Sequence, residues 1–332
     1  MKTNAIIRII VFSLAIIVLS TILLSVLDQN YYIADGKIQS YEMAGPVPTE
    51  SVREVNQHDI STQIQNIEIE WVAGSITIHR SDSLSNIHVS ETCPAESEHK
   101  MVVKQSGQTL KIQFSDETIK LSSFGINVDV SKDLVITVPR NWNCNNLEIE
   151  TASAEVLIDG MTIHEFDFDG ASGVCNITNC DIQEMDIDTA SGNVGFSGTL
   201  ETLDCDAASA DCKIEVTNIP RSVKLDAMSG DLELILPPDA GFTCNLDSMS
   251  GSFNSDFEFR TISETYIHGD GSCKINVSAL SGDVSILKGL TAVHTGATYC
   301  TDANCNDPSH DHSGICKDEN CTDAAHGHNN HH

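Results

Sequence analysis

A pattern of twelve residues recurs eight times between residues 67 and 286, and this repetition constrains the fold more than any other feature of the sequence. Successive copies from residue 147 to residue 244 start 19, 19, 18, 20 and 21 residues apart, and the last copy starts 31 residues after its predecessor. Repeats of this length are typical of solenoids, in which each copy packs on the next. The longer final step predicts an inserted loop around residues 256–274. The copies start at Ile67, Leu147, Phe166, Met185, Leu203, Val223, Cys244 and Ile275.

Hydrophobic residues alternate with polar ones on both sides of the centre of each copy. Positions 1, 3, 10 and 12 are apolar in 31 of 32 cases, and positions 2, 4, 9 and 11 in only 2 of 32. This period of two predicts a strand, a turn and a second strand in every copy. Five copies carry Ser-Gly at the turn, where Gly permits a positive φ and the Ser hydroxyl can bond the turn backbone. The apolar residues at position six are predicted to point inward at this corner: Ala152, Ala171, Ala190, Ala208, Met228, Met249 and Leu280.

A single strand–turn–strand unit cannot bury its own apolar face, but stacked units can. We therefore expect an all-β fold, a parallel β-helix or β-solenoid with coils of about 19–21 residues, over residues 59–290. Residues 84–138 hold less regular strands and are expected to form the first coils.

The amino terminus carries a long apolar segment. Residues 9–27 contain no charge, no Gly and no Pro, and 19 helical residues nearly cross a bilayer core. Lys2 and Arg8 precede the segment, so the positive-inside rule places the N-terminus in the cytoplasm and the remainder outside the cell. We expect residues 1–27 to be a transmembrane anchor and residues 28–58 to be a juxtamembrane linker. The alternative is a cleaved signal peptide, although no A-x-A site ends the segment.

The turn sequences TASGN (residues 189–193) and MSGD (residues 228–231), the strand LVITVP (residues 134–139) and the apolar N-terminus resemble one bacterial family. This is the "putative adhesin" family of exported β-repeat domains, and the resemblance covers roughly residues 59–288. It implies a β-solenoid-like fold on the cell surface and no catalytic residues. Similar domains are also linked with envelope-stress sensing at the membrane.

The charge of the chain excludes some partners. It has 48 acidic and 18 basic side chains, hence a formal net charge of −30 at pH 7. Proteins bind nucleic acid by neutralising phosphates, so this charge has the wrong sign for a nucleic-acid partner. Aromatic residues make up only 5% of the chain and offer few platforms for stacking bases or sugars.

Many of the acidic residues recur at the same two positions of the pattern. In parallel stacked coils these side chains lie about 4.8 Å apart, where like charges destabilise a sheet. Two interpretations remain open: a solvated face that keeps solenoids from sticking together, and a calcium-binding face. Position 4 holds Glu70, Glu150, Asp169, Asp188, Asp206, Asp226 and Asp247, and position 2 adds Glu68, Glu148, Asp167, Asp186 and Asp204.

Four cysteines fall on inward positions of the pattern: Cys175, Cys205, Cys212 and Cys244. Either they pack as small hydrophobic side chains, or they form disulfides between neighbouring coils of an exported protein. The pattern does not place Cys93, Cys144, Cys180 and Cys273.

Residues 291–332 form a tail of different composition, in which a 16-residue unit occurs twice. Each copy reads C-x4-C-x4-H-x-H, and two thiolates with two imidazoles suit tetrahedral zinc, with copper(I) as the alternative. Two small disulfide loops, Cys300–Cys305 and Cys316–Cys321, are the competing interpretation, but they do not explain why the histidines repeat with the cysteines. The predicted metal ligands are Cys300, Cys305, His310, His312, Cys316, Cys321, His326 and His328.

These features together favour a membrane-anchored extracellular protein that is not an enzyme. We expect a surface binding, adhesin-like or scaffold module with a cell-envelope or surface protein or polysaccharide as its partner. A metal-handling or envelope-stress-sensing protein is the alternative. A carbohydrate-active enzyme on a β-helix is less favoured, because the carboxylates recur alike in each coil and no catalytic pair stands out.

Overall fold

The computed structural model describes residues 31–34, 37–40, 53–94, 100–115, 131–262, 265–289, 310–311 and 315–316. The chain divides into one unit of Met1–Gly289 and a second of Leu290–His332. All regular structure within the described ranges is β-strand, so the predicted all-β class is confirmed. In these ranges there is no helix that is both long and apolar enough to span a membrane. The predicted anchor, residues 9–27, lies outside the described residues.

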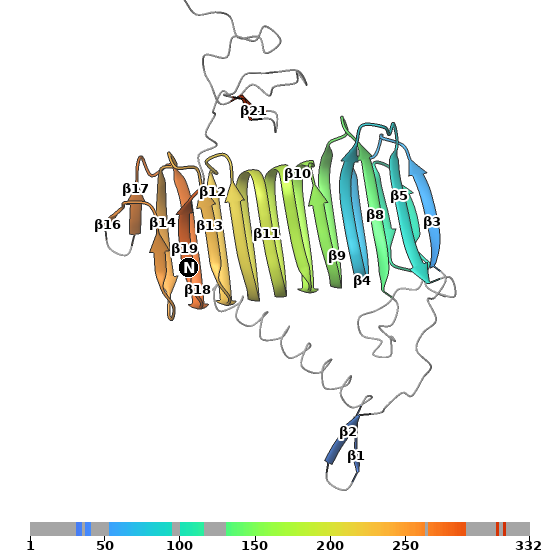
Figure 1. The fold of residues 1–332 in the computed structure, drawn as a ribbon, viewed down its shortest axis with the longest axis horizontal. Coiled ribbons are helices and arrows are strands. Elements are labelled where there is room, and N and C mark those ends of the chain that lie inside the picture. Colours follow the sequence, from blue (N-terminus) through green and yellow to red (C-terminus); the bar gives the residue numbers. More distant parts are fainter. Residues whose placement is uncertain are drawn as a thin grey trace, which may run out of the picture. The chain divides into compact units, whose positions relative to one another are not determined.

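The strands of the first unit run from a short hairpin into one long solenoid (Figure 1). The hairpin pairs β1 (Tyr31–Ala34) with β2 (Lys37–Ser40), so strand structure begins within the predicted linker. The solenoid consists of β3 (Arg53–Ile60), β4 (Asn66–Ser81), β5 (Ile87–Pro94), β6 (Val102–Ser106), β7 (Thr109–Gln113), β8 (Lys132–Pro139), β9 (Cys144–Asp159), β10 (Thr162–Ser172), β11 (Val174–Val216), β12 (Ser222–Ser229), β13 (Leu232–Leu236), β14 (Phe242–Ser248), β15 (Phe253–Ser255), β16 (Arg260–Ile262), β17 (Thr265–His268), β18 (Cys273–Ser281) and β19 (Val284–Lys288).

Equivalent positions of the repeat stack in parallel register, as a β-solenoid requires. Phe166 of β10 pairs with Leu147 of β9 on one side and with Met185 of β11 on the other. All three residues occupy position 1 of their copies and are buried. The inward rows of Ile, Val, Leu and Phe form one continuous core, and each fully buried side chain of this kind contributes roughly 1.5–3 kcal/mol.

The coils do not stack in chain order at the two ends of the solenoid. At the C-terminal end, β18 lies between β12 and β14, so the last copy of the repeat is inserted between the two copies that precede it in the sequence. At the N-terminal end, β4 lies between β9 and the pair of β7 and β8. Antiparallel pairs close both ends: β17 lies on β14, and β5 lies on β8. The predicted insertion around residues 256–274 therefore contributes β16 and β17 to the end of the stack.

The prediction that position six points inward is wrong. Position five is inward instead, because the period-two alternation of positions 1 and 3 continues for one more step before the chain turns. Trp71, Thr151 and Ala207 occupy position five and are buried. At position six, Met249 is 79% exposed and Leu280 is 46% exposed.

The corner itself depends on glycine where coils approach most closely. Gly192 has a φ of +112°, and a Cβ at this position would lie 1.7 Å from the backbone oxygen of Gly173 in the preceding coil. The predicted positive φ is thus confirmed, and the close stacking excludes any side chain. Two of these serine hydroxyls bond a neighbouring coil rather than their own turn: Ser172 Oγ donates to Ala152 O at 3.1 Å, and Ser191 Oγ to Ala171 O at 3.3 Å. They therefore tie successive corners together.

Candidate functional site: an acidic face with lysines at its ends

Two columns of carboxylates run side by side along the outer surface of the first strands of the coils. Strands β4, β9, β10, β11 and β12 are neighbours in parallel register, so residues at positions 2 and 4 of successive copies stack on the same outward side. We call this surface the acidic face, and it contains Glu68, Glu148, Asp167, Asp186 and Asp204 in one column and Glu70, Glu150, Asp169, Asp188, Asp206 and Asp226 in the other.

A lysine stands at each end of the acidic face. Lys111 of β7 contacts Glu68 Oε2 at 3.6 Å and forms a closer ion pair with Glu70. At the other end, Lys224 of β12 pairs with Asp204, with Asp206 at 2.9 Å and with Asp226 at 3.3 Å. Burial lowers the pKa of Lys224, but hydrogen bonds from its ammonium to Asp204 and Asp206 outweigh this and raise it. The end carboxylates are thus neutralised by residues of the chain itself.

The carboxylates in the centre of the acidic face are in a different electrostatic state. Partial desolvation between the coils raises the pKa of Glu148, Glu150, Asp169 and Asp186, and the charges of neighbouring carboxylates raise it further. The effect is largest at Asp188, whose pKa rises to about 6 through desolvation and the charges of Asp206 and Asp169.

At the Lys111 end of the acidic face, the pKa of a carboxylate is lowered instead of raised. Burial would raise the pKa of Glu70, yet hydrogen bonds from Lys111 and Gln113 hold it below its usual value. The carboxylates that looked alike in the sequence therefore differ by their distance from the two lysines. The sequence held a signal for this: Lys224 occupies position 2 of its copy, where earlier copies carry acids.

The acidic face offers repeated negative charge rather than a preformed metal centre. Within the described part of the chain, no three His, Cys, Asp or Glu side chains are grouped so that they could hold a metal ion. The columns present carboxylates to solvent at the strand spacing of about 4.8 Å. This arrangement suits an extended ligand with several cationic groups, each of which would relieve repulsion between neighbouring carboxylates.

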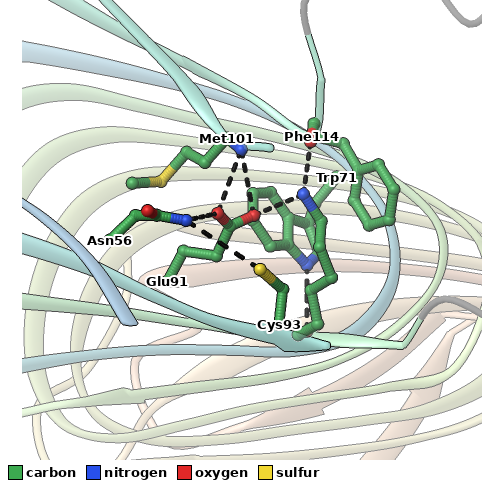
Figure 2. Close-up of polar contacts among 7 residues, drawn as sticks. Asn56, Trp71, Glu91, Cys93, Met101 and Phe114 are labelled. Carbon is green, nitrogen blue, oxygen red and sulfur yellow. Dashed lines mark hydrogen bonds and ion pairs between the residues drawn. The ribbon is translucent and has the colours of Figure 1, made fainter. Parts of the chain in front are cut away.

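A second polar cluster lies buried at the N-terminal end of the solenoid, and sequence reasoning missed it (Figure 2). Lys132 of β8 and Glu91 of β5 are both fully buried and form a close ion pair. Glu91 also accepts hydrogen bonds from the Met101 amide, at 3.0 Å to each oxygen, and from Asn56 Nδ2 at 2.9 Å. The Lys132 ammonium donates to Phe114 O.

Aromatic rings complete the surroundings of this lysine. Its Nζ lies 3.8 Å from the centre of the Phe114 ring and 4.8 Å from that of Trp71. Burial lowers the pKa of Lys132, while the hydrogen bond and charge of Glu91 oppose that change. The cluster joins β3, β4, β5 and β8 with Met101, just before β6, and Phe114, just after β7. It closes the first coil, so we regard it as structural.

Comparison with known proteins is consistent with this architecture. Residues 64–287 match the profile of the Toastrack DUF4097 family. The chain belongs to this family. The resemblance predicted from the turn sequences is thereby confirmed, and the fold is that of a Toastrack domain.

Several solved structures resemble this Toastrack domain. A "putative adhesin" from Bacteroides fragilis is 14% identical, with a TM-score of 0.39, and the match covers 73% of this chain and 100% of that one. A "putative cell adhesion protein" from Clostridium sporogenes is 10% identical, with a TM-score of 0.36 and coverage of 72% and 100%. A "putative lipid binding protein" from Parabacteroides distasonis is 15% identical, with a TM-score of 0.24 and coverage of 72% and 98%. No curated protein matches the chain.

The cysteines of the Toastrack domain lie in its core. The inward placement predicted for Cys175, Cys205, Cys212 and Cys244 is confirmed, since all four are buried. Cys93, Cys144, Cys180 and Cys273, which the pattern did not place, are buried as well, and none of these eight cysteines forms a disulfide in this structure. Burial raises the pKa of Cys175 and Cys244 to about 12, which makes these two thiols unreactive at neutral pH.

Two of the predicted metal ligands of the tail fall on described residues. Strands β20 (His310–Asp311) and β21 (Ile315–Cys316) form an antiparallel pair in which His310 lies opposite Cys316. Within the tail, the backbone thus brings a predicted ligand position of the first 16-residue copy beside one of the second 16-residue copy. The other predicted ligands lie outside the described residues: Cys300, Cys305, His312, Cys321, His326 and His328.

Proposed function

We propose that this Toastrack protein is a non-enzymatic surface binding module whose acidic face receives a cationic partner on the cell envelope or on another surface. The observation that carries the proposal is the uneven neutralisation of that face. Lysines of the chain compensate both ends, whereas partial desolvation and the charges of neighbouring carboxylates raise the pKa of the central carboxylates, most of all that of Asp188.

An uncompensated row of carboxylates gains free energy when cations approach it. Two unit charges about 5 Å apart repel by about 1 kcal/mol even in water, and each cationic group bound between two carboxylates offsets part of this repulsion. Amino groups on a polypeptide or a polysaccharide can repeat along a chain in the way that the carboxylates repeat along the coils. A single calcium ion needs six to eight converging oxygen ligands, and the described residues provide no such group.

Binding of a cationic probe tests this function. We suggest measuring the affinity of the full-length protein in mild detergent for fluorescent oligolysine, with oligoglutamate as the negative probe. Asp186→Asn with Asp188→Asn should weaken oligolysine binding by about fivefold, as expected for two lost surface charge pairs. The matched control, Asp211→Asn with Glu215→Gln, removes the same charge from exposed positions on the second strand of a coil. Equal losses in the two double variants would show that only net charge matters.

Calcium provides a further arm of the same experiment. At constant ionic strength, Ca²⁺ should compete with oligolysine no better than Mg²⁺ if the acidic face binds extended cations. Strong competition by Ca²⁺ alone would favour the calcium site instead and overturn the proposal.

We also propose that residues 9–27 anchor the protein in the membrane, with residues 28–332 outside the cytoplasm. The uncharged 19-residue segment and the positive residues before it support this. Membrane fractionation with N-terminal sequencing tests the anchor. A soluble mature chain that starts near Asp28 would contradict it.

A second candidate function, metal binding, belongs to the tail. The ligand types recur at identical offsets in the two 16-residue units, which supports one zinc or copper(I) ion per unit. Under reducing conditions, Co²⁺ titration of the full chain should give intense visible bands at two ions per chain. Replacing Cys300 and Cys305 by Ser should halve that number. Affinity should fall as the pH drops below ~6, because the histidines must be neutral and the cysteines deprotonated. Absence of such bands would favour disulfide loops.

A further inference from the structure

Two cysteines face each other inside one coil of the solenoid. Cys205 and Cys212 lie in β11, both buried, and their Sγ atoms are 3.5 Å apart. They occupy positions 3 and 10 of the copy that starts at Leu203. No other copy has cysteine at both positions; the preceding copy, for example, carries Ile187 and Val194 there. We propose that Cys205 and Cys212 form a disulfide bond that closes this coil across its interior.

The corner of this coil keeps the serine of position 7, Ser209, but lacks two other groups that hold corners elsewhere, a glycine at position 8 and a threonine hydroxyl at position 5. Position 8, where other coils have glycine, is occupied by Ala210, and the copy that starts at Leu147 likewise has Ala154. In that earlier copy the corner is held by a hydrogen bond from the Ala154 amide to Thr151 Oγ1 at 3.1 Å. The residue equivalent to Thr151 in the later copy is Ala207, which has no hydroxyl. A covalent bond between positions 3 and 10 would hold the two strands together at this corner.

The local geometry allows the bond to form. A disulfide has an S–S length of about 2.05 Å, so the two sulfur atoms must approach by roughly 1.5 Å, a movement within reach of side-chain rotation. Only the small side chains Ala207 and Ala210 point inward between the two cysteines and the corner. The two thiols share a hydrogen bond, and this contact raises the pKa of Cys205 and lowers that of Cys212.

The bond requires an oxidant that itself carries a disulfide, either a small one such as glutathione disulfide or a thiol–disulfide oxidoreductase. The thiolate of one of the two cysteines attacks the disulfide of the oxidant and releases one of its sulfur atoms as a thiol. The thiolate of the other cysteine then attacks the mixed disulfide, forms the Cys205–Cys212 bond and releases the second thiol. One disulfide of the oxidant is consumed, and two protein thiols are oxidised. Because both cysteines are buried in the folded domain, the exchange belongs to folding, before the coils have stacked.

Peptide mapping of the full chain tests the assignment without any substitution. The reduced, unfolded protein is refolded in mild detergent with a mixture of reduced glutathione and glutathione disulfide, and free thiols are then blocked with N-ethylmaleimide in denaturant. Cleavage before Asp204, Asp206 and Asp211 separates the two cysteines into different peptides. We expect these peptides to remain joined until reduction, and neither cysteine to carry the blocking group.

Two variants sharpen the result. Cys205→Ser should abolish the linked peptides and leave Cys212 fully blocked by N-ethylmaleimide. Cys175→Ser, which removes a cysteine at position 10 of another coil, should leave the Cys205–Cys212 link intact. A reducing agent should lower the unfolding temperature of the wild type but not that of Cys205→Ser. Complete alkylation of both cysteines in the refolded wild type, or linkage of either one to a different cysteine, would overturn the proposal.

Discussion

Replacing Asp188 by asparagine should stabilise the protein, although it removes a charged group from a well-formed strand. The side chain lies on the acidic face between Asp169 and Asp206 of the neighbouring coils, and its pKa is raised by partial desolvation and then by the charges of Asp206 and Asp169. Asparagine has nearly the same shape and no charge. Asp188→Asn therefore removes the repulsion and leaves the inward packing of Ile187 unchanged.

The size of the expected stabilisation follows from the raised pKa of Asp188. A shift from 3.8 to about 6 corresponds to an upper limit of roughly 3 kcal/mol at 1.36 kcal/mol per unit. Asp188 is an exposed side chain, and solvent screens the interaction, so we expect a gain of about 1 kcal/mol at pH 7.

The sign of the pH dependence follows as well. The folded-state pKa is raised above the unfolded value, so the wild type loses stability as the pH rises from about 4 through about 6. The advantage of the asparagine variant should accordingly be near zero at pH 4 and complete at pH 7.

Urea unfolding of the full chain in mild detergent, followed by the fluorescence of the buried Trp71 and Trp142, measures the effect without adding salt. The matched control is Asp206→Asn, one coil along in the same column. Asp206 is only 16% exposed and accepts the Lys224 ammonium at 2.9 Å, so its loss should destabilise the protein by about 1 kcal/mol. If both variants changed stability in the same direction at pH 7 and low salt, the division of the acidic face into compensated and uncompensated carboxylates would be refuted.

Three further substitutions test the fold by the same unfolding assay. Ile187→Asp should destabilise by several kcal/mol, because this fully buried side chain has no partner for a charge. Gly192→Ala should lower the free energy of unfolding by more than about 3 kcal/mol, because the new Cβ would meet a backbone oxygen at 1.7 Å. Its control is Gly107→Ala, where φ is +59° and no atom lies within 4 Å of the new Cβ, so the expected loss is about 1 kcal/mol. Lys132→Met should cost about 3–5 kcal/mol by leaving Glu91 charged and buried, and adding Glu91→Gln should recover part of that loss; no recovery would contradict the ion-pair assignment.

Much of the solenoid is determined by the sequence alone. The period of two assigns inward and outward positions without knowledge of the partner strand, because successive side chains of any strand point to opposite faces. Copies with the same pattern can bury their apolar rows only against one another, so the stacking and the acidic columns follow. The glycine at the corner is likewise readable, since a positive φ and close stacking leave few alternatives to glycine.

Only the tertiary structure decided how the coils are ordered and which groups meet across them. The copy that starts at Ile275 pairs between the copies that start at Val223 and Cys244, although each copy carries the same local signal. The pairing of Lys132 with Glu91 joins residues 41 positions apart through the antiparallel contact of β5 with β8. The physical reason is that a repeat determines which side chains of each strand must be buried. It does not determine which of the equivalent strands packs beside that strand. That choice depends on the loops between strands and on how the two ends of the stack are closed.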